Sequence, residues 1–157
     1  MKRIMFVCHG NICRSPMAEF VFKDKIKKLG LEKEFYVCSS ATSTEEIWGD
    51  VGNPVYPPAK EELKKHGISC DGKRAIQAKK QDYENYDLFV VMDRYNQRNL
   101  YNIFGHDKDN KIVKLLSFCG ESGDVADPWY TGDFSITYFD IDRGTDALLK
   151  YLLSKGE

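Results

Sequence analysis

The sequence has 157 residues, of which 42% are hydrophobic and 13% aromatic, and this is enough to bury the core of one ordinary domain over residues 1–157. Its 23 basic and 24 acidic residues leave a formal net charge of -1, which provides no overall attraction for nucleic acid or an anionic membrane. Neither kind of partner is expected, and any anion site must be local.

The amino terminus and the cysteines point to the cytoplasm. Residues 1–8 begin like a secretory signal but lack its long apolar stretch and small-residue cleavage site, and no run elsewhere could span a bilayer. The cysteines are odd in number and scattered, so we expect free thiols at Cys8, Cys13, Cys38, Cys70 and Cys119.

Apolar runs of strand length alternate along the chain with apolar residues at helical spacing. The first run predicts a strand over residues 2–7 and then a helix over 17–29. The later ones predict a strand over 34–40, a helix over 58–66, a strand over 88–92, a helix over 93–104, a strand over 111–116 and a helix over 136–153. In the closing helix we expect four leucines to face the core, namely Leu148, Leu149, Leu152 and Leu153.

Strands that alternate with helices favour a parallel sheet covered on both faces. We therefore predict a small doubly wound α/β sheet of four parallel strands, with helices on both faces and an anion-binding loop after the first strand. Two long segments, residues 41–57 and 117–134, show neither pattern. Loops of this length in a compact domain are usually functional or mobile.

The segment after the first predicted strand has the composition of an anion-binding loop and reads CHGNICRSP over residues 8–16. Gly10 permits backbone conformations closed to other residues, Asn11 tolerates a left-handed one, and Pro16 suits the first turn of a helix. Ligands of an open α/β sheet bind beyond the carboxyl ends of the strands, where free N–H groups of a helix terminus attract anions. Residues 8–15 are therefore predicted to form an anion nest.

Cys8 and Arg14 are the reactive groups of this loop. A loop that wraps an anion returns the Arg14 guanidinium to the side of a phosphate that the sulfur does not approach, and its planar fork can bind two phosphate oxygens. The helix terminus, the inward N–H groups and Arg14 favour a thiolate, so Cys8 is the expected nucleophile. Alternatively, Cys8 is a buried strand cysteine and Arg14 a surface helix residue, which is where such residues usually lie when each is taken singly.

The loop as a whole resembles the signature of the low-molecular-weight protein tyrosine phosphatases, through Cys8, Gly10, Asn11, Cys13, Arg14, Ser15 and Pro16. The resemblance spans nearly the whole chain and implies hydrolysis of phosphotyrosine and aryl phosphate monoesters through a phosphocysteine intermediate. Ser39 matches a family position that supports the loop through Asn11. The chain departs from the family at Gly72, where many members have a histidine, and at Tyr56, where some have an aspartate.

A phosphatase without a metal needs a carboxylic acid to protonate the departing oxygen. The family carries this acid in an Asp-Pro motif, which Asp127-Pro128 resembles. Asp127 is therefore the expected general acid, and Pro128 would stiffen its loop. Asp124 and Asp133 are alternatives, but neither precedes a proline, and a solvated loop charge is the simpler interpretation of each.

Aromatic side chains in the two long loops are expected to wall the cleft around a flat leaving group, as in the family. These are Trp129 and Tyr130, together with Trp48, for which core packing is an alternative. The residues expected to bind substrate are His9, Gly10, Asn11, Ile12, Cys13, Ser15, Trp48, Trp129 and Tyr130.

Three other functions stay open. Arsenate reductases share this fold and loop but pass oxidation through closely spaced additional cysteines, whereas Cys70 and Cys119 are far apart. Protein arginine phosphatases of one bacterial branch have a threonine at the loop position that Ile12 occupies here. The apolar Ile12 and the Trp129-Tyr130 pair favour an aromatic leaving group over phosphoarginine. A non-enzymatic module that binds phosphorylated partners would need neither a nucleophile nor an acid.

The resemblance implies phosphotyrosine-containing proteins or peptides as partners, inorganic phosphate as a product, and a monomer or weak dimer. No cofactor or metal is expected, because the three histidines form no ligand spacing with a cysteine pair. Cys13 is the expected redox partner of Cys8, because it could capture a sulfenic acid there as a reversible disulfide, as the resemblance also implies. Alternatively, Cys13 is an apolar filler beneath the loop.

Overall fold

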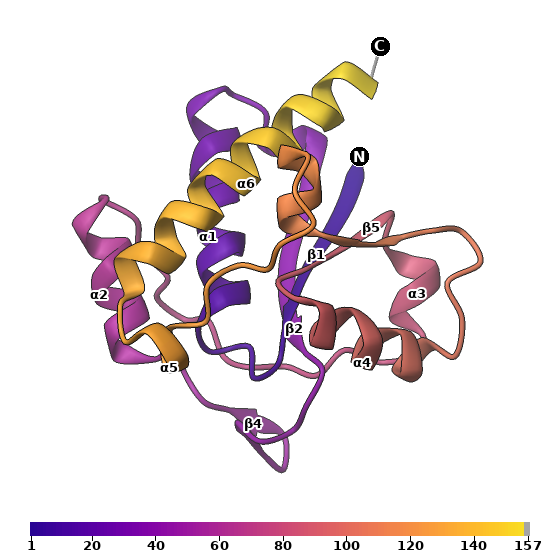
Figure 1. Ribbon diagram of the computed structural model, residues 1–157, viewed down its shortest axis with the longest axis horizontal. Helices are drawn as coiled ribbons and strands as arrows, with labels where there is room; N and C mark the ends of the chain where they lie inside the picture. Colours follow the sequence, from indigo (N-terminus) through magenta and orange to yellow (C-terminus); the bar gives the residue numbers. More distant parts are fainter. Residues whose placement is uncertain (156–157) are drawn as a thin grey trace.

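The centre of the computed structural model, which describes residues 1–155, is a four-stranded parallel sheet (Figure 1). In the order β2-β1-β5-β6, its strands are β2 (Phe35–Ala41), β1 (Lys2–Cys8), β5 (Leu88–Val91) and β6 (Ile112–Lys114). β1 pairs with β2 on one side, where Cys8 lies opposite Ala41, and with β5 on the other, where Val7 lies opposite Val91. The central position of β1 explains its continuous run of buried residues, because both of its faces are covered.

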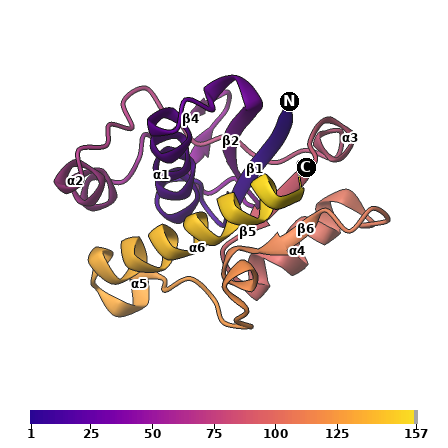
Figure 2. The same cartoon turned by 90° about the horizontal axis from the view of Figure 1, so that it is seen from above.

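Helices cover both faces of the sheet, as predicted (Figure 2). On one face lie α1 (Arg14–Lys28), α2 (Pro57–Lys65) and α6 (Phe134–Lys155), packed against the Ile4 and Phe6 side of β1. On the other lie α3 (Asp82–Asn85) and α4 (Arg94–Phe104), packed against its Met5 and Val7 side. This alternation along β1 is the period of a strand buried on both faces. The α/β sheet of four parallel strands is confirmed.

The two long segments without strand or helix periodicity contain short elements. Residues 41–57 contain a two-stranded antiparallel hairpin, β3 (Ile47–Trp48) and β4 (Val51–Gly52). Residues 117–134 contain the end of the 3-10 helix η2 (Leu115–Cys119) and the single turn α5 (Pro128–Thr131), while a second 3-10 turn, η1 (Glu32–Glu34), precedes β2. The strand predicted over 111–116 is therefore shorter, because its last two residues open η2.

The closing helix α6 packs through Leu148, Leu149 and Leu152, as expected, but Leu153 is 43% exposed. This part of the prediction was wrong because Leu153 follows the buried Leu152 by one position and lies at the edge of the face that Leu148, Leu149 and Leu152 bury. Farther back, Gly144 lets α6 approach η2, since a Cβ built there would lie 2.6 Å from Cγ of Leu115. Within residues 1–155, no helix has the length and apolar character needed to cross a membrane.

Candidate active site

The predicted anion loop connects the end of the central strand to the start of α1. Cys8 is the last residue of β1 and Arg14 is the first of α1. Asn11 has the left-handed backbone conformation expected of it, with φ 58°, and Pro16 lies in the first turn of α1. The loop thus wraps around a point at the carboxyl edge of the sheet, beside a helix amino terminus, where an anion is favoured.

Hydrogen-bond donors surround the sulfur of Cys8, which is almost fully buried. The backbone N–H of Asn11 donates to Sγ over 3.3 Å, and Oγ of Ser15 lies 3.0 Å from it. These polar contacts hold the sulfur in place at the end of β1. This environment suits a nucleophile.

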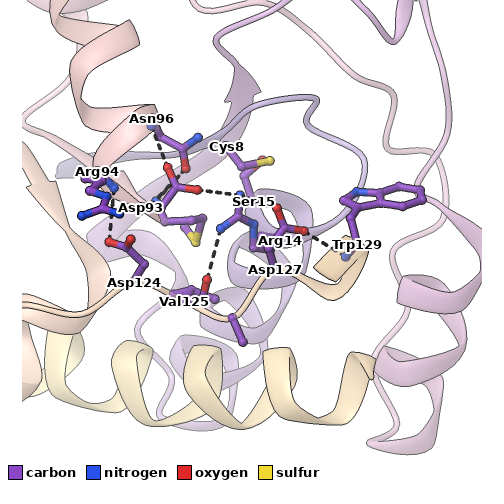
Figure 3. A network of polar contacts seen from close by, with 12 residues as sticks. Cys8, Arg14, Ser15, Asp93, Arg94, Asn96, Asp124, Val125, Asp127 and Trp129 are labelled. Atoms are coloured by element: carbon purple, nitrogen blue, oxygen red, sulfur yellow. Dashed lines mark hydrogen bonds and ion pairs between the residues drawn. The ribbon is translucent and has the colours of Figure 1, made fainter. Parts of the chain in front are cut away.

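The Arg14 guanidinium is fixed by three acceptors from later parts of the chain (Figure 3). It donates to Oδ2 of Asp93 over 2.9 Å and to the carbonyl oxygen of Val125 over 3.2 Å, and Oδ2 of Asp127 lies 3.6 Å away. Burial alone would lower the pKa of Arg14, but the charges of Cys8, Asp93 and Asp127 together raise it. Arg14 is therefore a permanent, oriented cation beside the loop.

Asp93 has a role that the sequence did not reveal. It is the N-cap of α4, where Oδ1 accepts from the backbone N–H of Asn96 over 2.7 Å in a reciprocal capping box. Its other oxygen holds Arg14. In the sequence, this role is indicated only by the position of Asp93 at the carboxyl end of β5, the strand beside the one that ends at Cys8. The partner of each carboxylate oxygen becomes known only from the fold.

Asp127 is the one of the three candidate acids that lies in the pocket. It caps α5, accepting at Oδ1 from the N–H of Trp129 over 3.0 Å, and Pro128 occupies the first helical position. Asp124 instead accepts from Lys114 and from the N–H of Arg94, away from the pocket. Asp133 accepts from the hydroxyl and N–H of Ser135, which lower its pKa and so leave it without a proton to donate as a general acid.

A cavity of about 490 Å³ opens above the loop. Its lining contains, from the expected set, Cys8, His9, Gly10, Ile12, Cys13, Arg14, Asp127, Trp129 and Tyr130. It also contains Glu45, Glu46 and Tyr95, which the sequence analysis missed.

Trp48 is absent from this lining and is 73% exposed on the β3–β4 hairpin, so the structure supports neither its role as a wall nor core packing. Glu45 and Glu46, which precede β3, line the cavity, and the side chain of Trp48 is left in solvent. In its place, Tyr56 supports the wall, with its ring centroid 4.8 Å from that of Trp129. Tyr56 is also tied to the loop, because its N–H donates to the carbonyl oxygen of Ile12 over 2.8 Å.

Asn11 and Ser15 belong to the loop but do not line the cavity, because both residues are fully buried. Nδ2 of Asn11 donates to Oγ of Ser15 over 2.8 Å and to Oγ of Ser39 over 2.9 Å, and its Oδ1 accepts from the N–H of Ile76 over 3.1 Å. The structure therefore brings Ser39 to Asn11 as the resemblance implied. These residues hold the shape of the loop and act on a ligand through Cys8.

Cys13 is a buried thiol next to Arg14. Burial, followed by the charge of Cys8, raises its pKa well above the ordinary value, so Cys13 is protonated at neutral pH. No disulfide joins any of the five cysteines, all of which lie in the described part of the chain. Among residues 1–155, no three His, Cys, Asp or Glu side chains are grouped so as to hold a metal ion.

Comparison with known proteins decides the family. A family model for low molecular weight phosphotyrosine protein phosphatases matches residues 3–157. The chain belongs to this family. The phosphatase is 38% identical over 151 residues to the low molecular weight protein-tyrosine-phosphatase YfkJ of Bacillus subtilis, over 95% of this chain and 94% of YfkJ. The family predicted from the loop is thereby confirmed.

Solved structures agree with this assignment. The crystal structure of YfkJ matches the phosphatase with a TM-score of 0.93 at 36% identity, covering 100% of this chain and 98% of YfkJ. SP-PTP of Streptococcus pyogenes matches with a TM-score of 0.85 at 37% identity, covering 97% and 93%. The YwlE arginine phosphatase of Bacillus subtilis matches with a TM-score of 0.80 at 28% identity, covering 96% and 95%.

Proposed function

We propose that this phosphatase hydrolyses phosphotyrosine in proteins or peptides, with Cys8 as nucleophile, Arg14 as phosphate clamp and Asp127 as general acid. The observation that carries the proposal is the convergence of these three side chains on one cavity, where Asp127 lies 3.6 Å from Arg14 and Arg14 lies six residues from Cys8 around the loop. A nucleophile, a cation and a carboxyl group at one phosphate site are the parts of metal-independent phosphoryl transfer.

The reaction proceeds in two displacements. The Cys8 thiolate attacks phosphorus and forms the P–S bond, while the bond from phosphorus to the tyrosine oxygen breaks and Asp127 gives that oxygen its proton. Water then attacks phosphorus and gives a proton to the Asp127 carboxylate. The P–S bond breaks, inorganic phosphate leaves and the thiolate is restored. The Arg14 fork follows the phosphate oxygens through both steps.

Features of the cavity favour this function over the alternatives. The apolar side chains of Ile12, Trp129 and Tyr130 line the cavity and suit a flat aromatic group rather than a phosphorylated guanidinium. The cavity contains Cys8 and Cys13, whereas Cys70 and Cys119 are not part of its lining, which argues against an arsenate-reducing relay. A binding module would need neither the Cys8 environment nor Asp127.

We further propose a single domain over residues 1–157 that works as a monomer or weak dimer in the cytoplasm. The five unpaired thiols support a reducing compartment. Its partners are phosphotyrosine-containing proteins, and inorganic phosphate is the product. No cofactor enters the scheme, because attack, proton transfer and charge stabilisation are all assigned to side chains of this chain.

Steady-state hydrolysis of an aryl phosphate tests the assignment. Activity should persist in a chelator and be inhibited by vanadate, which mimics five-coordinate phosphorus. Cys8→Ser and Arg14→Ala should each lose most activity while remaining folded, and Cys119→Ser, a thiol outside the cavity, is the matched control and should retain it. Full activity in Cys8→Ser would reject the nucleophile. A higher kcat/KM for a phosphoarginine peptide than for the matched phosphotyrosine peptide would reject the substrate class.

A further inference from the structure

A buried ion pair lies beneath the anion loop and has no part in the mechanism above. The ammonium group of Lys73 lies 3.8 Å from Oε1 of Glu19, and their side chains are only 10% and 5% exposed. Lys73 also donates to the carbonyl oxygen of Ser39 over 2.8 Å. Burying two charges is costly, so such a pair is expected where it serves a specific arrangement of neighbouring groups.

Glu19 lies at the end of a chain of hydrogen bonds, and in each of them the donor and the acceptor can be assigned. The donor at Ile76 is a backbone N–H, so Oδ1 of Asn11 must face it, and both N–H bonds of the amide then point at Ser15 and Ser39. The Ser39 hydroxyl, having accepted from Asn11, donates its one hydrogen to Oε1 of Glu19 over 2.6 Å.

The other branch of this chain ends at the nucleophile. The Ser15 hydroxyl accepts from Asn11, which leaves its single hydrogen for Sγ of Cys8 at 3.0 Å or for the more distant carbonyl oxygen of Ser40 at 3.4 Å. A thiolate is the stronger and nearer acceptor. The sulfur thus receives a hydrogen bond whose direction follows from the orientation of Asn11.

Glu19 fits this arrangement as a carboxylate. Both of its oxygens face donors, Oε1 the hydroxyl of Ser39 and Oε2 the ammonium group of Lys23 at 2.6 Å, so each oxygen accepts. Burying this charge is costly, and the ammonium groups of Lys73 and Lys23 compensate it. Lys23 is 42% exposed and Lys73 is nearly enclosed, so Lys73 provides the less screened charge.

We propose that Lys73 is a positioning residue for the reaction: by pairing with the buried Glu19 carboxylate beneath the loop, it orients the Ser39, Asn11 and Ser15 hydrogen bonds toward the Cys8 thiolate. Gly72 delivers it there, because its backbone is left-handed at φ 86° and turns the chain just before Lys73. Lys73 does not line the cavity, so we assign its effect on the substrate to the residues between it and Cys8. The proposal rests on Cys8 being the nucleophile.

The test compares Lys73→Met with Lys73→Arg and, as a control, Lys33→Met, an exposed lysine in η1 at the opposite end of β2. The readouts are kcat for an aryl phosphate and the rate at which iodoacetamide alkylates Cys8 at pH 6, with the site assigned by mass spectrometry. Lys73→Met should slow both about tenfold, because it leaves the Glu19 charge with only the more exposed Lys23 as a partner. Lys73→Arg should retain half or more of each rate, and Lys33→Met should match the parent. A folded Lys73→Met with parental alkylation and kcat would overturn the proposal, even if its melting temperature were lower.

A double variant guards against a Lys73→Met protein that fails to fold. Glu19→Gln together with Lys73→Met removes both charges and leaves an amide oxygen to accept from Ser39. We expect its alkylation rate to be closer to that of the parent than to that of Lys73→Met, or, if the single variant is insoluble, within about threefold of the parent. Rates as slow as in a Glu19→Ala/Lys73→Met protein would show that the pair is structural. Alkylation needs no turnover, so a wrong nucleophile assignment would appear separately, as activity that survives Cys8→Ser.

Discussion

One carboxylate, that of Asp93, caps helix α4 with its first oxygen and holds the guanidinium of Arg14 with its second. The two contacts are 2.7 Å and 2.9 Å long, and both residues are buried. Asp93 thereby joins α4, on one face of the sheet, to the first residue of α1, on the other face. The orientation of the phosphate clamp depends on a helix cap.

Replacing Asp93 by asparagine separates these two functions. Asparagine is as good an N-cap as aspartate, so α4 should persist, while the loss of the buried ion pair with Arg14 should lower the melting temperature. The loss of charge beside Arg14 should lower kcat/KM for an aryl phosphate by about tenfold or more, because a misplaced clamp is costly. Asp124→Asn, which alters contacts to Lys114 and Arg94 only, is the control and should stay within about twofold of the parent. Parental kcat/KM in Asp93→Asn would contradict the role of Asp93.

Asp127→Ala should discriminate between leaving groups. Esters with poor leaving groups depend on proton donation, so their hydrolysis should slow by roughly 10²-fold or more, whereas activated aryl phosphates should be affected far less. The measurement is kcat across a series of substituted phenyl phosphates at one pH. Equal slowing across the series would move the general acid to Asp124 or Asp133.

The two tryptophans form a matched pair for testing the cavity wall. Trp129 lines the cavity and packs against Tyr56 with tilted rings, while Trp48 lies outside it and is mostly exposed. Trp129→Ala should lower kcat/KM for a phosphotyrosine peptide by about fivefold to tenfold through lost aromatic contact, and Trp48→Ala should change it less than about twofold. In the parent, a matched phosphoserine peptide should be a much poorer substrate, because its short side chain does not reach the loop. Equal losses in the two tryptophan variants would contradict the observed wall.

Cys13 is predicted to protect Cys8 from irreversible oxidation. Peroxide attacks a thiolate, and Cys13 is a thiol because burial raises its pKa, so sulfenic acid should form first at Cys8. The Cys13 thiol then condenses with it, forming the disulfide and releasing water. After peroxide treatment, dithiothreitol should restore activity to the parent and much less to Cys13→Ser. If both proteins recover equally, Cys13 is only a filler beneath the loop.

The sequence predicted the features that arise from local order. The four strands and the longer helices carry apolar periodicity over enough residues to be recognised, and the anion loop is a contiguous motif. The β3–β4 hairpin and α5 are too short to show a period, so Trp48 could not be placed. Contacts between distant residues were equally hidden, as with Tyr56 against Trp129 and Lys73 against Glu19. Leu153 is apolar like its neighbours but lies at the edge of the buried face of α6, one position after the buried Leu152.

The hydrogen bond from Arg14 to the carbonyl oxygen of Val125 joins residues 111 positions apart. Contacts of such high sequence separation form late, because closing the intervening chain costs entropy before the contact can repay it. During synthesis, the loop of residues 8–15 emerges among the first segments, yet its arginine acquires its last partners, Val125 and Asp127, only when the final third of the chain has folded onto it. Activity should therefore appear and disappear together with the global fold, which makes the rate of aryl phosphate hydrolysis a direct signal for following refolding in real time.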